Sequence, residues 1–294
     1  MEPSENALQA MDRLPVSKAV FKNILPSIGI FLMMLIYNYA DLFFIGLTHN
    51  DYMVSAITLA SPIFMFFMAF GSLFGTGGLT LISQDTARGN NDRIRKISSF
   101  CFWCSIGIGV LSLLLILFLA TPLAKLLGTN GIQTIEYTKN YLQWVAISAP
   151  CAVVANTFST LMRSEGKPMV SMVGMLLGNA VNIILDPIFI LGLDMGCTGA
   201  ALATSIGQLG AAVFYVVYIL RGKSSFSLRL RDFSGKDGIA KSVFAIGIPA
   251  ALVTVMMNLY QIISNAVMGH FGDLEVAAMG VGMKISVIGS VISN

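Results

Sequence analysis

Two aspartates lie inside long apolar stretches of the chain, where a charged side chain needs a partner. Asp41 falls in the stretch 24–46 and Asp186 in the stretch 168–192. In a membrane each such charge costs about 2.5 to 3.5 kcal/mol on insertion scales, so intramembrane acids are rare and mark ion or proton sites. The two aspartates are therefore the first candidates for chemistry in this sequence.

The composition places these stretches in a membrane. Of the 294 residues, 55% are hydrophobic and 11% are charged, and the mean hydropathy is +0.78. Soluble domains carry about 25% charged residues, and disordered chains need low hydrophobicity. The sequence therefore excludes a soluble enzyme and predicts an all-α, polytopic transmembrane helical bundle that is not an enzyme and binds no nucleic acid.

Apolar stretches long enough to cross a membrane recur along the chain. A bilayer core of about 30 Å needs roughly 20 apolar residues per helix. We expect seven full spans and the start of an eighth, at 24–46, 53–82, 97–120, 137–162, 168–192, 197–220, 239–269 and 274–294.

The basic residues predict how these spans are oriented. Positive charge gathers in cytoplasmic loops, and 15 of the 18 basic residues precede the first span or follow the second, fourth and sixth. The opposite loops hold Lys125 and Lys139, and Lys284, to which we assign no role, falls in the eighth stretch. We therefore expect a multi-pass protein of the cell (plasma) inner membrane with a cytoplasmic N-terminus.

The seventh span repeats the first. Aligning Pro26 with Pro249 also aligns Tyr37 with Tyr260 and Gly46 with Gly269. Because an even number of helices separates the two copies, the repeat is parallel, and such transporters contain two six-helix lobes. A complete protein of this kind has roughly 440 to 460 residues, so we expect the chain to be truncated after the start of the eighth helix; a natural eight-helix protein is the alternative.

This repeat predicts four segments. They are a cytoplasmic N-terminal segment 1–22, an N-lobe 23–220, a cytoplasmic linker 221–241 and the start of a C-lobe 242–294.

The two aspartates are expected at one level of the membrane. Each lies five or six residues from the outer end of its span, or about 8 to 10 Å below the surface. Asn182 lies one turn from Asp186 on the same face, Thr204 reaches the same depth, and Pro187 can free a backbone carbonyl nearby. Oxygen groups of this kind suit a hard monovalent cation or a shared proton. The alternative is that each group only bonds a neighbouring helix.

Further residues are candidates for a cavity or a hinge. Tyr37 and Asn38 lie about one turn inward of Asp41 and Met33 about two turns, where they could line a substrate cavity; Asn156 in the fourth span is another polar candidate. Pro26 either starts the first helix or forms its pivot.

Two other motifs indicate packing rather than chemistry. The glycine-rich run 70–78 lacks the ending of a phosphate-binding loop and is better explained by close helix packing. Cys101 and Cys104 lack a second cysteine pair, so we interpret them as membrane-buried thiols.

Five short motifs occur in a characteristic order and spacing. They are NYADLFFIG at 38–46, ARGN at 87–90, MRSEGKP at 162–168, NAVNIILDP at 179–187 and GAALAT at 199–204. With these motifs the sequence resembles the multidrug and toxic compound extrusion (MATE) transporters.

The resemblance implies a monomeric protein with twelve helices that alternates between outward and inward openings. Such a protein exports small organic, often cationic, compounds in exchange for Na⁺ or H⁺, contacts membrane lipid and needs no cofactor besides the coupling ion. The matching positions imply a cation site, for Na⁺ or H⁺, that consists of Asp41, Asn182, Asp186 and Thr204, with the carbonyl of Ala200 as a further ligand.

The sequence departs from some branches of the family. Those branches carry an acid in the seventh span, where this chain has Asn258, Gln261, Ser264 and Asn265, and Ser264 is the repeat counterpart of Asp41. The chain therefore resembles the DinF-like branch, with coupling in the N-lobe.

Two other functions, a flippase and a receptor, fit the sequence less well than export does. A flippase for lipid-linked oligosaccharides needs a cationic cavity, whereas the intramembrane charges of the first six spans are acidic. The inward N-terminus, the parallel repeat and the eighth apolar stretch oppose a seven-helix receptor.

Overall fold

The structure, a computed structural model, describes residues 50–126, 132–236 and 238–269, together with residues 29, 32, 33, 36, 40 and 43–48. From residue 50 onward the described elements are α3 (Asp51–Ala87), α4 (Asn91–Leu126), α5 (Ile132–Ser164), α6 (Pro168–Pro187), the π-helix η1 (Ile188–Gly192), α7 (Gly196–Leu220), the 3₁₀-helix η2 (Leu230–Asp232) and α8 (Ile239–Gly269). No strand occurs among them.

Six of these helical stretches are long and apolar enough to cross a membrane. They coincide, within a few residues, with the six spans predicted between residues 53 and 269, and the fold class is confirmed. The bundle also exposes large apolar side chains; Phe118 of α4, for example, is 82% exposed. Side chains of this kind are stable against lipid but not against water. The first predicted span is described only in part, and the eighth lies outside the described residues.

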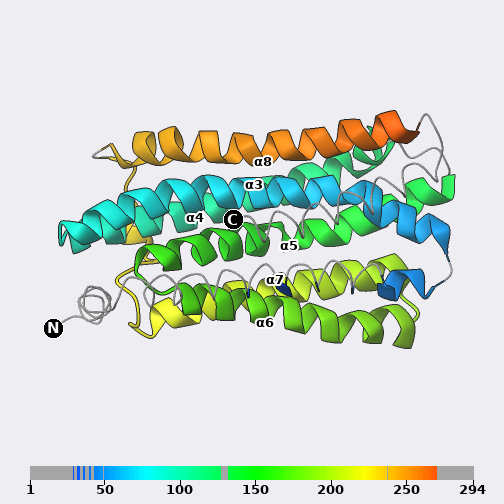
Figure 1. Cartoon of the computed structure of the whole chain (residues 1–294), viewed down its shortest axis with the longest axis horizontal. Helices are drawn as coiled ribbons and strands as arrows, with labels where there is room; N and C mark the ends of the chain where they lie inside the picture. Colours follow the sequence, from blue (N-terminus) through cyan, green and yellow to red (C-terminus); the bar gives the residue numbers. More distant parts are fainter. Residues whose placement is uncertain are drawn as a thin grey trace.

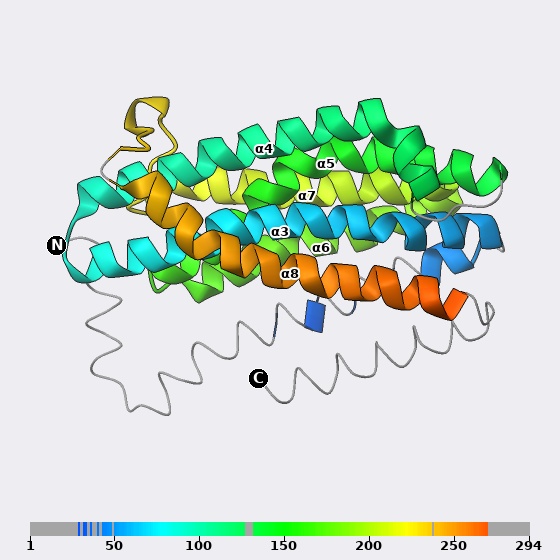
Figure 2. The ribbon, with the colours of Figure 1, turned by 90° about the horizontal axis from the view of Figure 1, so that it is seen from above.

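Helix α5 is the centre of the bundle. It packs against α3, α4, α6 and α7. Within its apolar 18-residue stretch 72% is buried, whereas in the corresponding stretch of α4 only 22% is buried. Helices α6 and α7 lie together on one side, and α8 lies along α3 on the other (Figure 1). The view from above shows α8 crossing the face of α3 (Figure 2). The contact between α6 and α7 therefore lies on the side of the bundle that faces away from α8.

Small residues let the helices approach closely. In the run 70–78, a Cβ atom on Gly71 would lie 2.6 Å from the Cβ of Asn156 in α5. A Cβ on Gly77 would lie 2.4 Å from the carbonyl oxygen of Val243 in α8. The run thus packs α3 against a helix on either side, which confirms the packing interpretation of its glycines.

The turns between consecutive helices lie at the two ends of the bundle. The end with the α3–α4 turn, the α5–α6 turn and the segment 221–236 is called the basic end; its core contains Phe74, Ile82, Phe158, Ile239 and Val243. The core toward the opposite end contains Phe67, Leu142, Val145, Ile190 and Ala200. The basic end carries Arg88, Arg93, Arg95, Lys96, Arg163, Lys167, Arg221, Lys223, Arg229, Arg231 and Lys236.

The α4–α5 contact gives a test of this packing. Gly109→Ala would place a Cβ atom 2.4 Å from the Cα of Pro150, and backbone atoms cannot move aside as a flexible side chain can. Overpacking of this kind costs about 1 to 3 kcal/mol, so the midpoint of thermal unfolding of the purified protein should fall.

The matched control is Gly107→Ala, two residues away in the same helix, where nothing lies within 4 Å. Alanine is favoured over glycine in helices by about 1 kcal/mol, so this variant should keep or raise the midpoint. Equal midpoints for the two variants would contradict the close approach of α4 and α5.

Candidate cation site

The buried face of α6 carries two of the predicted site residues. Its buried residues are Ser171, Gly174, Gly178, Asn182 and Asp186. Steps of three and four residues keep these positions on one side of the helix, and this side faces α7. Two glycines and three polar residues therefore share one narrow stripe of an otherwise apolar helix.

The polar residues of this stripe meet Thr204 of α7. Asp186 is 0% exposed, Asn182 is 2% exposed and Thr204 is 3% exposed. The amide nitrogen of Asn182 lies 3.4 Å from Asp186 Oδ1 and 3.3 Å from Thr204 Oγ1. With the amide turned over, its nitrogen donates to Asp186 Oδ2 at 3.3 Å and its oxygen accepts from the backbone N–H of Thr204 at 3.0 Å. In both orientations Asn182 links the carboxylate to α7.

Two glycines make this contact possible. A Cβ atom on Gly178 would lie 2.9 Å from the carbonyl oxygen of Gly207. A Cβ on Gly207 would lie 2.6 Å from the carbonyl oxygen of Gly178 and 3.1 Å from the Cβ of Asn182. The α6 and α7 backbones therefore touch one turn from Asn182, close enough for this short side chain to reach Thr204.

The backbone changes form directly after Asp186. Pro187 has no N–H to donate to the carbonyl of Ile183, and the chain continues as the π-helix η1, in which the N–H of Leu193 donates to the carbonyl of Ile188 at 2.9 Å. Single π turns of this kind are frequent at functional sites. The irregular backbone thus begins two residues after the buried acid.

The other predicted site residues are placed as follows. Ala200 is fully buried in α7, one turn before Thr204, and its role as a ligand stays a prediction. Asp41, Tyr37, Asn38 and Pro26 lie outside the described residues.

Two of the predicted cavity residues have described positions. Met33 is helical and half-buried. Asn156 lies between α5 and α3, where its amide nitrogen donates to the sulfur of Met68 at 2.7 Å. The structure therefore brings together Asn182, Asp186 and Thr204 and places Asn156 in the contact between α3 and α5.

Sequence reasoning missed the residues that hold the site together. Gly174 and Gly178 precede Asn182 at four-residue steps, so their place on the same face could have been noticed. The position of Gly207 against Asn182 depends on how α7 packs and has no signal in the sequence.

The side chains at this site are a carboxylate, a carboxamide and a hydroxyl, and each has an oxygen atom that can serve as a ligand for a cation. Oxygen donors suit hard cations such as Na⁺, and a carboxylate can take up a proton instead. Among the described residues there is no group of three or more His, Cys, Asp or Glu side chains that could hold a metal ion. The oxygen groups of Asn182, Asp186 and Thr204 suit a monovalent cation or a proton.

Comparison with known proteins relates this geometry to a family. The MatE family model matches residues 26–188, more than half of the chain, and the matched region includes Asn182 and Asp186. The chain belongs to the MATE family.

Individual relatives agree with this assignment. The multidrug export protein MepA of Staphylococcus aureus (strain NCTC 8325) is 33% identical over 281 residues, a match that covers 96% of this chain and 62% of MepA. The chain thus spans less than two thirds of the length of these curated relatives.

Solved structures share the fold. A MOP superfamily transporter from Pyrococcus furiosus, described as having a binding pocket of reverse polarity, superposes with a TM-score of 0.86 at 25% identity and covers 96% of this chain and 62% of its own. A MATE crystal structure in complex with MaL6 superposes with a TM-score of 0.87, also at 25% identity and with the same coverage. The helices of this MATE protein are therefore arranged as in solved transporters.

The contact between the glycines predicts a loss of function without any change to a polar group. Gly207→Ala should push α7 away from Asn182, because neither the Gly178 carbonyl nor the Asn182 Cβ can yield easily. We expect drug export by cells that express the variant to fall severalfold at equal amounts of protein in the membrane.

The control is Gly210→Ala in the same helix, which meets nothing within 4 Å and should export normally. Normal export by Gly207→Ala would show that the spacing of α6 and α7 is unimportant for the site.

Proposed function

We propose that the protein exports small organic, often cationic, compounds in exchange for Na⁺ or H⁺, by alternating access between two lobes. Membership of the MATE family and the likeness to the multidrug export protein MepA support export of drugs. The exchange with a cation is supported by the buried acid on α6.

The observation that carries the proposal is the environment of Asp186. This carboxylate is fully buried in a membrane-spanning helix, and it is held by Asn182 next to the hydroxyl of Thr204. Burying a charge without function would be costly and is rare. The site offers what reversible binding of a monovalent cation needs: one negative charge and neighbouring neutral oxygen groups.

The coupling follows from the change in charge at this site. In the proposed mechanism Asp41 lies at the same level as Asp186, and two nearby carboxylates repel each other unless a cation or a proton lies between them. Binding of the ion removes a cost of a few kcal/mol, which is enough to shift an equilibrium between two conformations. For a bound Na⁺ the amide oxygen of Asn182, rather than its nitrogen, would face the ion.

Exchange requires that ion and drug prefer different states of the protein. In the proposal the ion favours one opening and the drug the other, with Pro26 as the pivot of the first helix. Met33, Tyr37, Asn38 and Asn156 are the proposed cavity residues. We further propose a monomer in the cell inner membrane, with the N-terminus and the basic end in the cytoplasm.

Flippase activity is less well supported. A pocket for lipid-linked pyrophosphate needs positive charge, whereas the fully buried charged side chain that the structure describes at this site is an acid, Asp186.

Neutralising the buried acid tests the proposal. Asp186→Asn keeps the shape of the side chain but removes its charge, so efflux of a dye such as ethidium should be abolished while the protein remains in the membrane. Asp41→Asn should have the same effect.

The control variant is Asp194→Asn, a change of the same kind at an exposed position with a φ of 54°, which asparagine tolerates. It should export at the wild-type rate. Wild-type efflux by Asp186→Asn would refute the assignment of the site.

Purified protein in vesicles identifies the coupling ion. A sodium gradient and a pH gradient are imposed separately, and drug uptake is followed in each case. Uptake should respond to at least one gradient in the wild type and to neither in Asp186→Asn. Equal uptake in the absence of any gradient would contradict exchange with a cation.

A further inference from the structure

Another buried acid, Glu165, lies at the basic end, just before the start of α6, whereas Asp186 lies at the other end of this helix. Glu165 follows α5 in the MRSEGKP motif and is 2% exposed. The proposed transport mechanism makes no use of it. A buried carboxylate is stable only when it is paired and hydrogen-bonded, so its partners indicate what it does.

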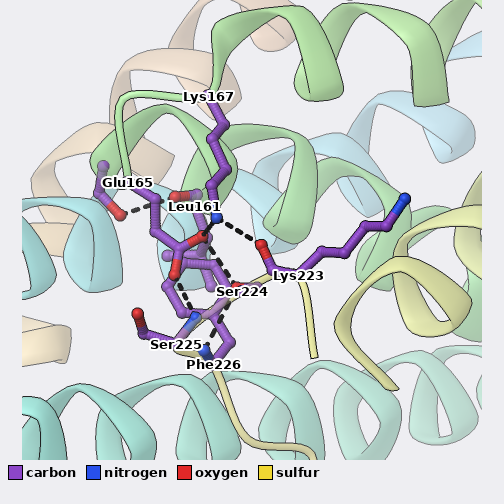
Figure 3. A network of polar contacts seen from close by, with 8 residues as sticks. Leu161, Glu165, Lys167, Lys223, Ser224, Ser225 and Phe226 are labelled. Carbon is purple, nitrogen blue, oxygen red and sulfur yellow. Dashed lines mark hydrogen bonds and ion pairs between the residues drawn. The ribbon is translucent and has the colours of Figure 1, made fainter. Parts of the chain in front are cut away.

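The partners of Glu165 come from the segment that follows α7 (Figure 3). Its Oε1 atom accepts from the backbone N–H of Ser225 at 2.7 Å, and its Oε2 atom accepts from the hydroxyl of Ser224 at 2.9 Å. Both donors lie about 60 residues further along the chain. The acid thus ties the end of α5 to the beginning of segment 221–236.

Lys167 completes this group. Its ammonium lies 2.8 Å from Glu165 Oε2 and donates to the backbone carbonyl of Lys223 at 2.6 Å, with the ring of Tyr218 5.8 Å away. The positive charge compensates the buried acid and binds the same segment a second time. Glu165 and Lys167 therefore act together on Lys223, Ser224 and Ser225.

The rest of the segment lies along α4. The N–H of Ser227 donates to Ser98 Oγ at 3.0 Å, and Ser99 Oγ donates to the carbonyl of Arg229 at 2.8 Å. The indole N–H of Trp103 donates to the carbonyl of Leu228 at 3.2 Å. A segment without long helices is thus held to the N-lobe by its backbone.

The segment leads directly into α8. The first residue of α8, Ile239, and Val243 one turn later are fully buried in the core at the basic end, together with Phe74 and Ile82. Whatever fixes the segment therefore also fixes the point at which α8 leaves the N-lobe.

We infer that Glu165 is a positioning residue for transport: with Lys167 it fastens segment 221–236 to the N-lobe, so that α8 starts from a fixed point when the lobes move. This inference rests on the proposed two-lobe mechanism. Glu165 contacts neither drug nor ion; it acts through the segment.

Hydrogen exchange of the full-length protein in lipid nanodiscs tests the fastening directly. In Glu165→Gln the side chain would present an amide nitrogen where Lys167 and Ser224 also donate. We expect the amides of residues 224–229 to exchange at least about tenfold faster, because a segment with fewer anchoring bonds opens more often. Ser224→Ala removes the bond that the hydroxyl donates to Glu165 and the bond that it accepts from the N–H of Phe226, but it leaves the carboxylate in place. It should therefore give a smaller increase, and it serves if Glu165→Gln does not fold.

The matched control is Asp85→Asn at the same end of the bundle. Asp85 is also 2% exposed and forms an ion pair with Arg93 at 3.4 Å, but in the described part of the chain its carboxylate does not bond to segment 221–236. This variant should leave the exchange of residues 224–229 unchanged.

Transport kinetics then separate positioning from simple stability. Glu165→Gln should lower the maximal rate of drug export at least about threefold, with an unchanged KM, because the binding residues keep their places while the lobes move less effectively. Unchanged exchange in Glu165→Gln, or faster exchange with a wild-type maximal rate, would overturn the inference. The exchange result does not depend on the coupling ion, so it stands or falls separately from the Asp186 test.

Discussion

A carboxylate buried in a membrane must be paired, and in this protein the pairing depends on how closely two helices approach. Asn182 reaches both Asp186 and Thr204 because Gly178 and Gly207 let α6 and α7 touch one turn away. A side chain at either glycine would separate the helices and break the contact of Asn182 with Thr204 of α7. The polar site and the small residues beside it are therefore one structural unit.

Two of the buried acids, Asp186 and Glu165, differ in their described partners. Asp186 is bonded by the amide of Asn182, next to the hydroxyl of Thr204, and such neutral groups suit the proposed binding of an ion. Glu165 pairs with Lys167 and accepts from the backbone of a distant segment. Its fixed counter-charge and its bonds to the segment indicate an anchor.

Much of this architecture could be predicted from the sequence. The spans between residues 53 and 269 follow from the length of apolar stretches. Helical rise alone puts Asp186 and Thr204 at one level, with Asn182 one turn away on the same face as Asp186. The MRSEGKP motif was recognised, but the role of Glu165 could not be, because its partners lie about 60 residues away and meet it only when segment 221–236 folds back. The contact of Gly207 with Asn182 could not be predicted either, because it depends on the packing of two helices. Asp41 stays a prediction of the sequence.

Infrared difference spectroscopy of the purified protein tests most directly whether Asp186 is the group that binds the ion. Adding Na⁺ or acid should change a carboxyl band in the wild type, because the ion or proton binds to a buried carboxylate. The account predicts that this change is lost or strongly reduced in Asp186→Asn and retained in Asp194→Asn. An identical difference spectrum in wild type and Asp186→Asn would contradict it.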